Sequence, residues 1–160
     1  MKSVAQSRFT EISFQLLKET FEGPPATGGS AFLDKGGGLF QTVEQVTPQM
    51  ASTEIRPGGP TIAAHIEHVR FYVGVHYKLM RGSTDAIDWE QSWRTRTVNL
   101  AEWDDLRREL RRAYSSLIEH FRAVDSWGED EISVAMAIIA HTAYHLGAVR
   151  QLIRTLKSHP

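Results

Sequence analysis

The chain has 160 residues, of which 41% are apolar and 23% are charged, and it contains no cysteine. This length suits a single domain over residues 1–160, because one hydrophobic core usually takes about 100 to 200 residues. The 18 Lys and Arg residues nearly balance the 19 Asp and Glu residues, so no strong electrostatic field is available to bind nucleic acid or an acidic membrane surface. The absence of cysteine excludes disulfides, thiolate metal sites, iron–sulfur clusters and a nucleophilic cysteine within the chain.

The N-terminal segment MKSVAQSRFTEISFQ carries polar and charged residues throughout, unlike the apolar stretch of a signal peptide. No other stretch approaches the roughly 18 consecutive apolar residues of a transmembrane helix. We therefore expect a cytoplasmic protein that does not enter a membrane.

The first predicted helix covers residues 4–22 and presents a broad apolar face at helical spacing. The GPP sequence that follows ends this helix, because proline interrupts helical hydrogen bonding. Residues 23–38 are rich in glycine and predict a long loop, and residues 39–52 predict a short helix before the breaker RPGGP.

A second long helix is predicted from Pro60 and Thr61 to about Arg81, because proline is tolerated at an early helical position. Gly82 ends it. Residues 83–98 lack helical periodicity and contain two tryptophans. We expect this segment to be a connection that packs over an edge of the core.

Two further helices complete the predicted set. Asn99, with Glu102 three residues later, predicts an N-terminal cap, and apolar residues then recur at steps of three and four as far as Val124. A last helix is predicted from about Glu129 to Lys157. Four amphipathic helices of about 20 residues, joined by long connections, predict an all-α protein built as a four-helix bundle.

Histidine is the notable polar residue, with seven copies. His141 and His145 are four residues apart on the last helix, so both imidazoles lie on the same face at a separation that one metal ion can bridge. On the second helix, His65 lies on the apolar face and His68 lies beside it, one turn away. A histidine of that helix is therefore available as a third ligand.

A single histidine on an apolar face is more often a hydrogen-bonded core residue than a metal ligand, and that alternative stays open. Several buried imidazoles without partners would, however, cost about 1 to 3 kcal/mol for each unsatisfied group. One divalent ion would satisfy them together. A site of three histidines with a fourth, open position suits Zn²⁺, and Ni²⁺, Fe²⁺ or Mn²⁺ can bind the same ligands.

Two common metal motifs are excluded by particular residues. A zinc protease of the HExxH type needs a glutamate directly after the first histidine, but Thr142 stands there. A di-iron carboxylate bundle needs Glu-x-x-His pairs, but Glu67 and Glu119 are each followed three residues later by arginine. His76 lies three turns from His65, about 16 Å by helical rise, which is too far to share the ion. His120 and His159 have no candidate partners in the sequence.

Three residues near the histidines have two interpretations each. Arg150 follows the histidine pair by about one turn, and it could approach an anionic substrate or pair with a carboxylate of a neighbouring helix. Tyr72 and Tyr144 could donate a proton, although filling the core is the more common role of tyrosine at such positions.

Two segments resemble the signature segments of the DinB superfamily, a family of metal-binding proteins. They are TIAAHIEHVRFYV at residues 61–73 and AHTAYHLGAVRQL at residues 140–152. EGPP, the glycine-rich loop after it and GLFQTVEQVTPQMAS are also similar to the first third of some members. The resemblance covers most of the chain except residues 83–125, and the HxxxHxG segment with an upstream histidine is its most specific part.

The resemblance implies an up-down-down-up four-helix bundle that is often a homodimer. It also implies a metal held by one histidine of the second helix and by both histidines of HxxxH. Carried over to this chain, the expected ligands are His65, His141 and His145, with His68 as the alternative on the second helix. Characterised members include transferases and isomerases that use bacillithiol, mycothiol or glutathione, in which the metal is thought to lower the pKa of the cofactor thiol.

The resemblance and the missing cysteine together favour an enzyme whose nucleophile is brought by a cofactor. The first hypothesis is a transferase in which a divalent ion, Zn²⁺ or Ni²⁺, binds a low-molecular-weight thiol as thiolate, which attacks an electrophilic small-molecule substrate. The alternatives are metal-assisted hydrolysis, and non-catalytic binding of metal or a small ligand in a stress response. The sequence assigns no catalytic residue.

Overall fold

The computed structural model describes residues 6–124 and 126–158, and every regular element within these ranges is helical. The prediction of an all-α protein is therefore confirmed. The elements, in chain order, are α1 (Gln6–Glu22), α2 (Leu39–Glu44), α3 (Pro48–Ser52), α4 (Ile62–Met80), the 3₁₀ helix η1 (Trp89–Trp93), α5 (Leu100–Ala123) and α6 (Glu129–Ser158).

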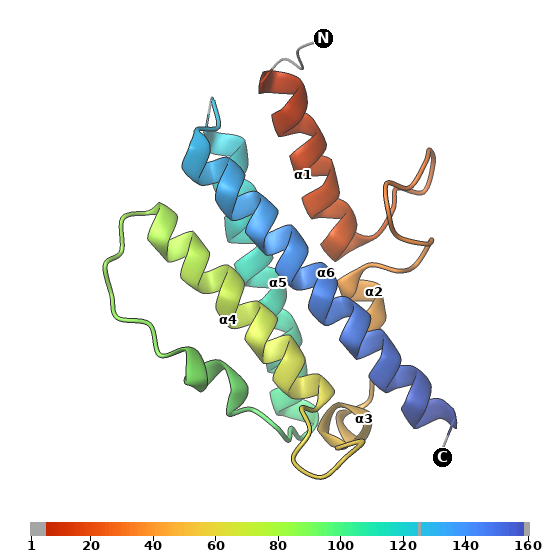
Figure 1. The fold of residues 1–160 in the computed structure, drawn as a ribbon. Helices are drawn as coiled ribbons and strands as arrows, with labels where there is room; N and C mark the ends of the chain where they lie inside the picture. Colours follow the sequence, from red (N-terminus) through yellow and green to blue (C-terminus); the bar gives the residue numbers. More distant parts are fainter. Residues whose placement is uncertain (1–5, 125, 159–160) are drawn as a thin grey trace.

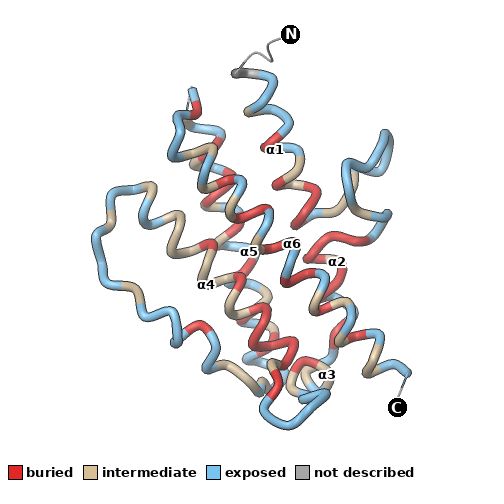
Figure 2. The backbone as a smooth tube through the Cα atoms, in the orientation of Figure 1, coloured by how far each residue is buried: buried red, intermediate tan, exposed pale blue. Residues whose placement is uncertain are grey.

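The four long helices lie side by side (Figure 1). In that view α1 and α6 run downward, whereas α4 and α5 run upward. α4 packs against both α5 and α6, and α6 also packs against α1. Buried residues are concentrated where these helices face one another (Figure 2). The segment between α4 and α5, which contains η1, runs along the outside of α4 and contacts it, as the two tryptophans in the sequence led us to expect.

The long helices α4 and α5 each begin after a polar residue whose side chain accepts a hydrogen bond from a free backbone N–H group of the first turn. At the start of α5, the Asn99 side chain accepts from Glu102 N at 3.0 Å, and the Glu102 carboxylate accepts from Asn99 N at 2.8 Å. This confirms the predicted cap. The start of α4 differs from the prediction, because Thr61 is its N-cap and accepts from Ala64 N at 3.2 Å. Pro60 therefore precedes the cap.

The short helix predicted over residues 39–52 is two helices in the structure, α2 and α3. Thr47 is extended and caps α3, and Pro48 is its first residue. A residue before proline is disfavoured in the helical conformation, so the chain leaves α2 and starts again after Thr47.

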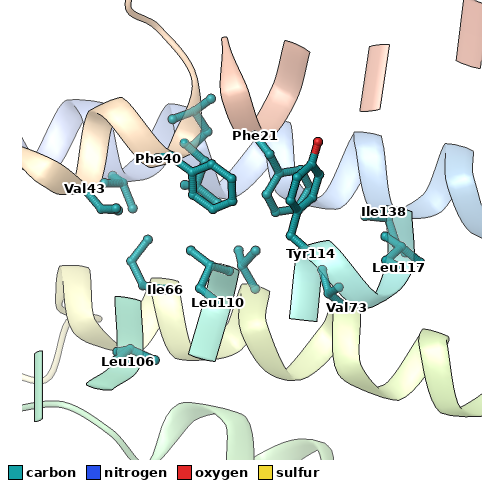
Figure 3. Packing of buried hydrophobic residues seen from close by; sticks show 14 of the residues in the cluster. Phe21, Phe40, Val43, Ile66, Val73, Leu106, Leu110, Tyr114, Leu117 and Ile138 are labelled. Carbon is teal, nitrogen blue, oxygen red and sulfur yellow. The ribbon is translucent and has the colours of Figure 1, made fainter. Parts of the chain in front are cut away.

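The centre of the core is a group of aromatic and aliphatic side chains from α1, α2, α4, α5 and α6 (Figure 3). Phe21 of α1 stacks on Tyr114 of α5, with ring centroids 4.7 Å apart. Phe40 of α2 packs edge-on against the same tyrosine at 5.3 Å. The Tyr114 hydroxyl donates to the Glu22 carboxylate at 2.6 Å. Side-chain packing thus joins α1 to α5 through the middle of the molecule.

Among the described helices, α6 is long and apolar enough to cross a membrane by length and composition alone. The core helix of a soluble protein passes the same test, because it too is largely apolar. In this structure α6 directs several of its apolar side chains, among them Ile138, Leu146 and Val149, into the shared core.

The glycine-rich loop after α1 is held by one carboxylate. Glu19 is only 6% exposed, and its oxygens accept hydrogen bonds from the backbone N–H groups of Ala31, Phe32 and Leu33 and from the Ser30 hydroxyl, at 2.8–3.0 Å. Burial raises the pKa of Glu19, but the four hydrogen bonds together outweigh burial and lower the pKa below its ordinary value. The loop is therefore ordered around an ionised side chain.

We predict that Glu19→Gln lowers the free energy of unfolding by about 1 to 3 kcal/mol, because the amide is uncharged and has one acceptor oxygen where the carboxylate uses two. The folded-state pKa of Glu19 is depressed, so its contribution is present above the unfolded pKa and is lost as the pH falls through the folded value. Urea unfolding from pH 7 to pH 3 measures both effects. Glu11→Gln, at an exposed position on the same helix, is the control. Equal losses for the two variants at pH 7 would contradict this account of Glu19.

Candidate metal centre

Four imidazoles meet between α4 and α6. His65 and His145 are buried, whereas His68 and His141 are partly buried. They form two close pairs, each joining one helix to the other. His65 Nδ1 lies 2.9 Å from His145 Nδ1, and His141 Nε2 lies 3.0 Å from His68 Nε2.

Three of these rings form a group with the dimensions of a metal site. One nitrogen from each of His68, His141 and His145 lies within 4.8 Å of the other two. Two nitrogens that each lie about 2.0 to 2.1 Å from one ion, at a right angle, are about 2.9 Å apart. The separation of 3.0 Å between His141 Nε2 and His68 Nε2 is close to this value. Three histidines here could therefore hold a divalent ion.

The structure brings together all the histidines that the sequence singled out. His141 and His145 belong to the group of three, and His68, the alternative on α4, is its third member. His65, the expected ligand on α4, lies against His145 on the same helix interface. Its role as a ligand stays a prediction.

The environment keeps these imidazoles uncharged. Burial, followed by the proximity of His68 and His76, lowers the pKa of His141 to about 4. Burial, with His141, His65 and His68 nearby, lowers the pKa of His145 to about 3. Burial also lowers the pKa values of His65 and His68. Neutral imidazoles carry the lone pairs that bind a metal ion, so the donor set fits a divalent cation.

Aromatic rings enclose the cluster on two sides. Trp93 of η1 stacks on His68, with centroids 4.1 Å apart and planes at 21°. Tyr72 of α4 stacks on His141 at 3.7 Å and 8°. Burial raises the pKa of Tyr72, so its phenol stays protonated. Tyr144, by contrast, is 74% exposed and packs its ring only edge-on to His145.

A hollow of about 270 Å³ adjoins the cluster at His65. Most of its wall is apolar, contributed by the loop before α4 and by the second half of α6, and Arg56 is one of the lining residues. Arg150 does not line this hollow; its guanidinium lies beside Gly37 in the glycine-rich loop, where an added Cβ would meet it at 3.2 Å. The suggestion that Arg150 approaches a substrate beside the histidines is therefore not supported by its position.

His76 and His120 are not members of the group of three. His76 packs on Tyr72 at 4.3 Å, and His120 packs edge-on against Tyr77 at 6.1 Å. His159 lies outside the described residues. His76 lies near enough to His141 to contribute to its lowered pKa, and that His76 does not share the ion stays a prediction.

Two residues of the site were not assigned from the sequence. Ser92 is fully buried and its Oγ lies 2.7 Å from His68 Nδ1. Trp93, next to it, covers His68. Both belong to the segment between α4 and α5, which has no helical periodicity. In the sequence, the two tryptophans of this segment were the only indication that it packs on the core.

Comparisons of the chain with protein-family models, with curated proteins and with solved structures found no match. The resemblance to the DinB superfamily therefore stays a prediction that rests on the two histidine segments.

We predict that Ni²⁺ quenches tryptophan fluorescence through Trp93, because this indole stacks on a ring of the candidate site. Trp93→Phe should remove most of the quenching. Trp127→Phe should leave it intact, because Trp127 packs against Phe14 and Phe121. Titration of each variant with Ni²⁺ measures the effect. Quenching of the Trp93→Phe variant to the wild-type extent would place the ion elsewhere.

Proposed function

We propose that this protein is a DinB-like metal-dependent transferase that adds a low-molecular-weight thiol to an electrophilic small molecule. The observation that carries the proposal is the close approach of three imidazoles from α4 and α6, with ligand atoms within 4.8 Å of one another. In this proposal His141 and His145 hold the ion together with a histidine of α4. Zn²⁺ and Ni²⁺ are the ions that this set of nitrogen ligands favours.

When bound, a divalent ion stabilises the deprotonated form of a thiol that approaches it. The side chains of this protein perform the other tasks. The three imidazoles are neutral and leave coordination positions free. Trp93 and Tyr72 pack on His68 and His141 and limit the access of water to them.

The hollow beside His65 is the place that we assign to the electrophilic substrate. Its mainly apolar wall suits an apolar organic group. The absence of cysteine from the chain is consistent with a nucleophile that arrives with a cofactor.

The helix directions are compatible with the same proposal. α1 and α6 run one way and α4 and α5 run the other way, which is the order of an up-down-down-up four-helix bundle. We extend the proposal to a cytoplasmic homodimer, as the resemblance implies, that acts without nucleic acid or a membrane.

We predict that the protein, purified without chelator and supplied with Zn²⁺ or Ni²⁺, retains about one ion per chain, as a three-histidine site requires. His141→Ala and His145→Ala should each abolish retention, because either change removes a ligand from the group. His120→Ala is the matched control, since this histidine packs against Tyr77 of α4 and belongs to no such group. Elemental analysis by mass spectrometry gives the result. Wild-type protein without a stoichiometric ion would refute the site.

We predict that the metal-loaded protein accelerates the reaction of at least one small thiol with a chromogenic electrophile. The same protein stripped of metal should give only the uncatalysed rate, because its histidines alone cannot stabilise a thiolate. A panel of bacillithiol, mycothiol and glutathione identifies the thiol. A metal-loaded protein with no rate above the stripped protein for any thiol would refute the transferase and favour non-catalytic metal binding.

A further inference from the structure

Ser92 is a buried hydroxyl that joins the covering segment to the candidate metal centre. Its side chain is fully buried, and it lies in η1, on a different element from every histidine of the cluster. Its Oγ donates to the Trp89 carbonyl oxygen at 2.6 Å. The same Oγ lies 2.7 Å from His68 Nδ1. The hydroxyl therefore has two close polar neighbours.

The single hydrogen of the Ser92 hydroxyl determines which ring nitrogen of His68 is protonated. A serine hydroxyl has one hydrogen, and a carbonyl oxygen can only accept. Because the Ser92 hydrogen is used at the Trp89 carbonyl, the bond to His68 is satisfied when His68 Nδ1 carries a hydrogen and donates it to Oγ. His68 is then the Nδ1–H tautomer, and its Nε2 keeps a lone pair.

That lone pair faces the site. His68 Nε2 is the atom that lies 3.0 Å from His141 Nε2, and His68 is a member of the group of three. Trp93, the residue after Ser92, stacks on the same ring and restricts its rotation. Two consecutive residues of η1 thus hold both the plane and the tautomer of one imidazole.

His65 has a different environment. Its Nδ1 contacts another imidazole, His145 Nδ1, at 2.9 Å. Either ring of such a pair can supply the shared hydrogen, so this contact does not determine which nitrogen of His65 carries the proton. A ligand whose tautomer is held by a partner on its other nitrogen is the usual arrangement in metal sites.

We propose that Ser92 is a positioning residue that presents His68 Nε2 to the ion and so makes His68, rather than His65, the ligand from α4. This inference rests on the proposed function for the presence of the ion. Ser92 itself does not touch the metal or the substrate; it acts through His68 Nδ1. Its loss should free His68 to exchange between its two tautomers.

The tautomer is measured without metal. In ¹⁵N-labelled, metal-free protein above pH 7, two-bond ¹H–¹⁵N correlation spectra distinguish Nδ1–H from Nε2–H, and the loss of signals in His68→Gln assigns His68. We expect Nδ1–H in the wild type and in Ser92→Thr, which keeps the hydroxyl, and a mixture in Ser92→Ala. Ser13→Ala, at a buried serine of α1, is the matched control and should resemble the wild type. The wild-type pattern in Ser92→Ala would overturn the proposal.

Zn²⁺ affinity from competition with a chelator is the second measurement. We expect Ser92→Ala to weaken binding about 10-fold to 100-fold, as other outer partners of metal-bound histidines do, and Ser92→Thr to restore it. His68→Ala should lose more affinity than His65→Ala. Wild-type affinity in Ser92→Ala, or a greater loss in His65→Ala than in His68→Ala, would overturn the proposal. Wild-type protein that binds no Zn²⁺ would instead refute the proposed function and, with it, the role of His68 as a ligand.

Discussion

The enclosure of four imidazoles between α4 and α6, two of them buried and two partly buried, is the constraint on which the rest of the site depends. Each ring carries nitrogens that need a hydrogen-bond partner or an ion, and leaving such a group unsatisfied costs about 1 to 3 kcal/mol. Pairing His65 with His145 and His68 with His141 across the interface gives one nitrogen of each ring a close partner, whereas His141 Nδ1 is buried without one. The same pairing brings three ligand atoms within reach of one ion. The contacts that partner these ring nitrogens therefore also assemble the candidate metal site.

The connections between the helices are ordered by side-chain contacts, and one of them contributes residues to the candidate site. Glu19 orders the glycine-rich loop by accepting four hydrogen bonds from it. On the other side of the molecule, η1 lies on α4 and places Ser92 and Trp93 against His68. Both connections are thus held by polar contacts of buried side chains, Glu19 and Ser92.

The four histidines near the α4–α6 interface share one chemical property, which is an uncharged imidazole. Lowered pKa values keep the histidines neutral and able to bind a metal, and this property is independent of the reaction. Two further observations support the transferase proposal. They are the resemblance carried by the two histidine segments and the absence of a cysteine nucleophile from the chain.

The sequence by itself determined the four long helices, the cap at Asn99 and the pairing of His141 with His145, because these features depend on residues three or four apart. It also directed the histidines of the second helix toward the core, but it left His65 and His68 as alternatives. Only the tertiary structure decided which groups meet them: Ser92 is 24 residues from His68 along the chain, and His145 is 80 residues from His65. Such contacts have no local signal, because they arise from the packing of α4, α6 and η1 against one another.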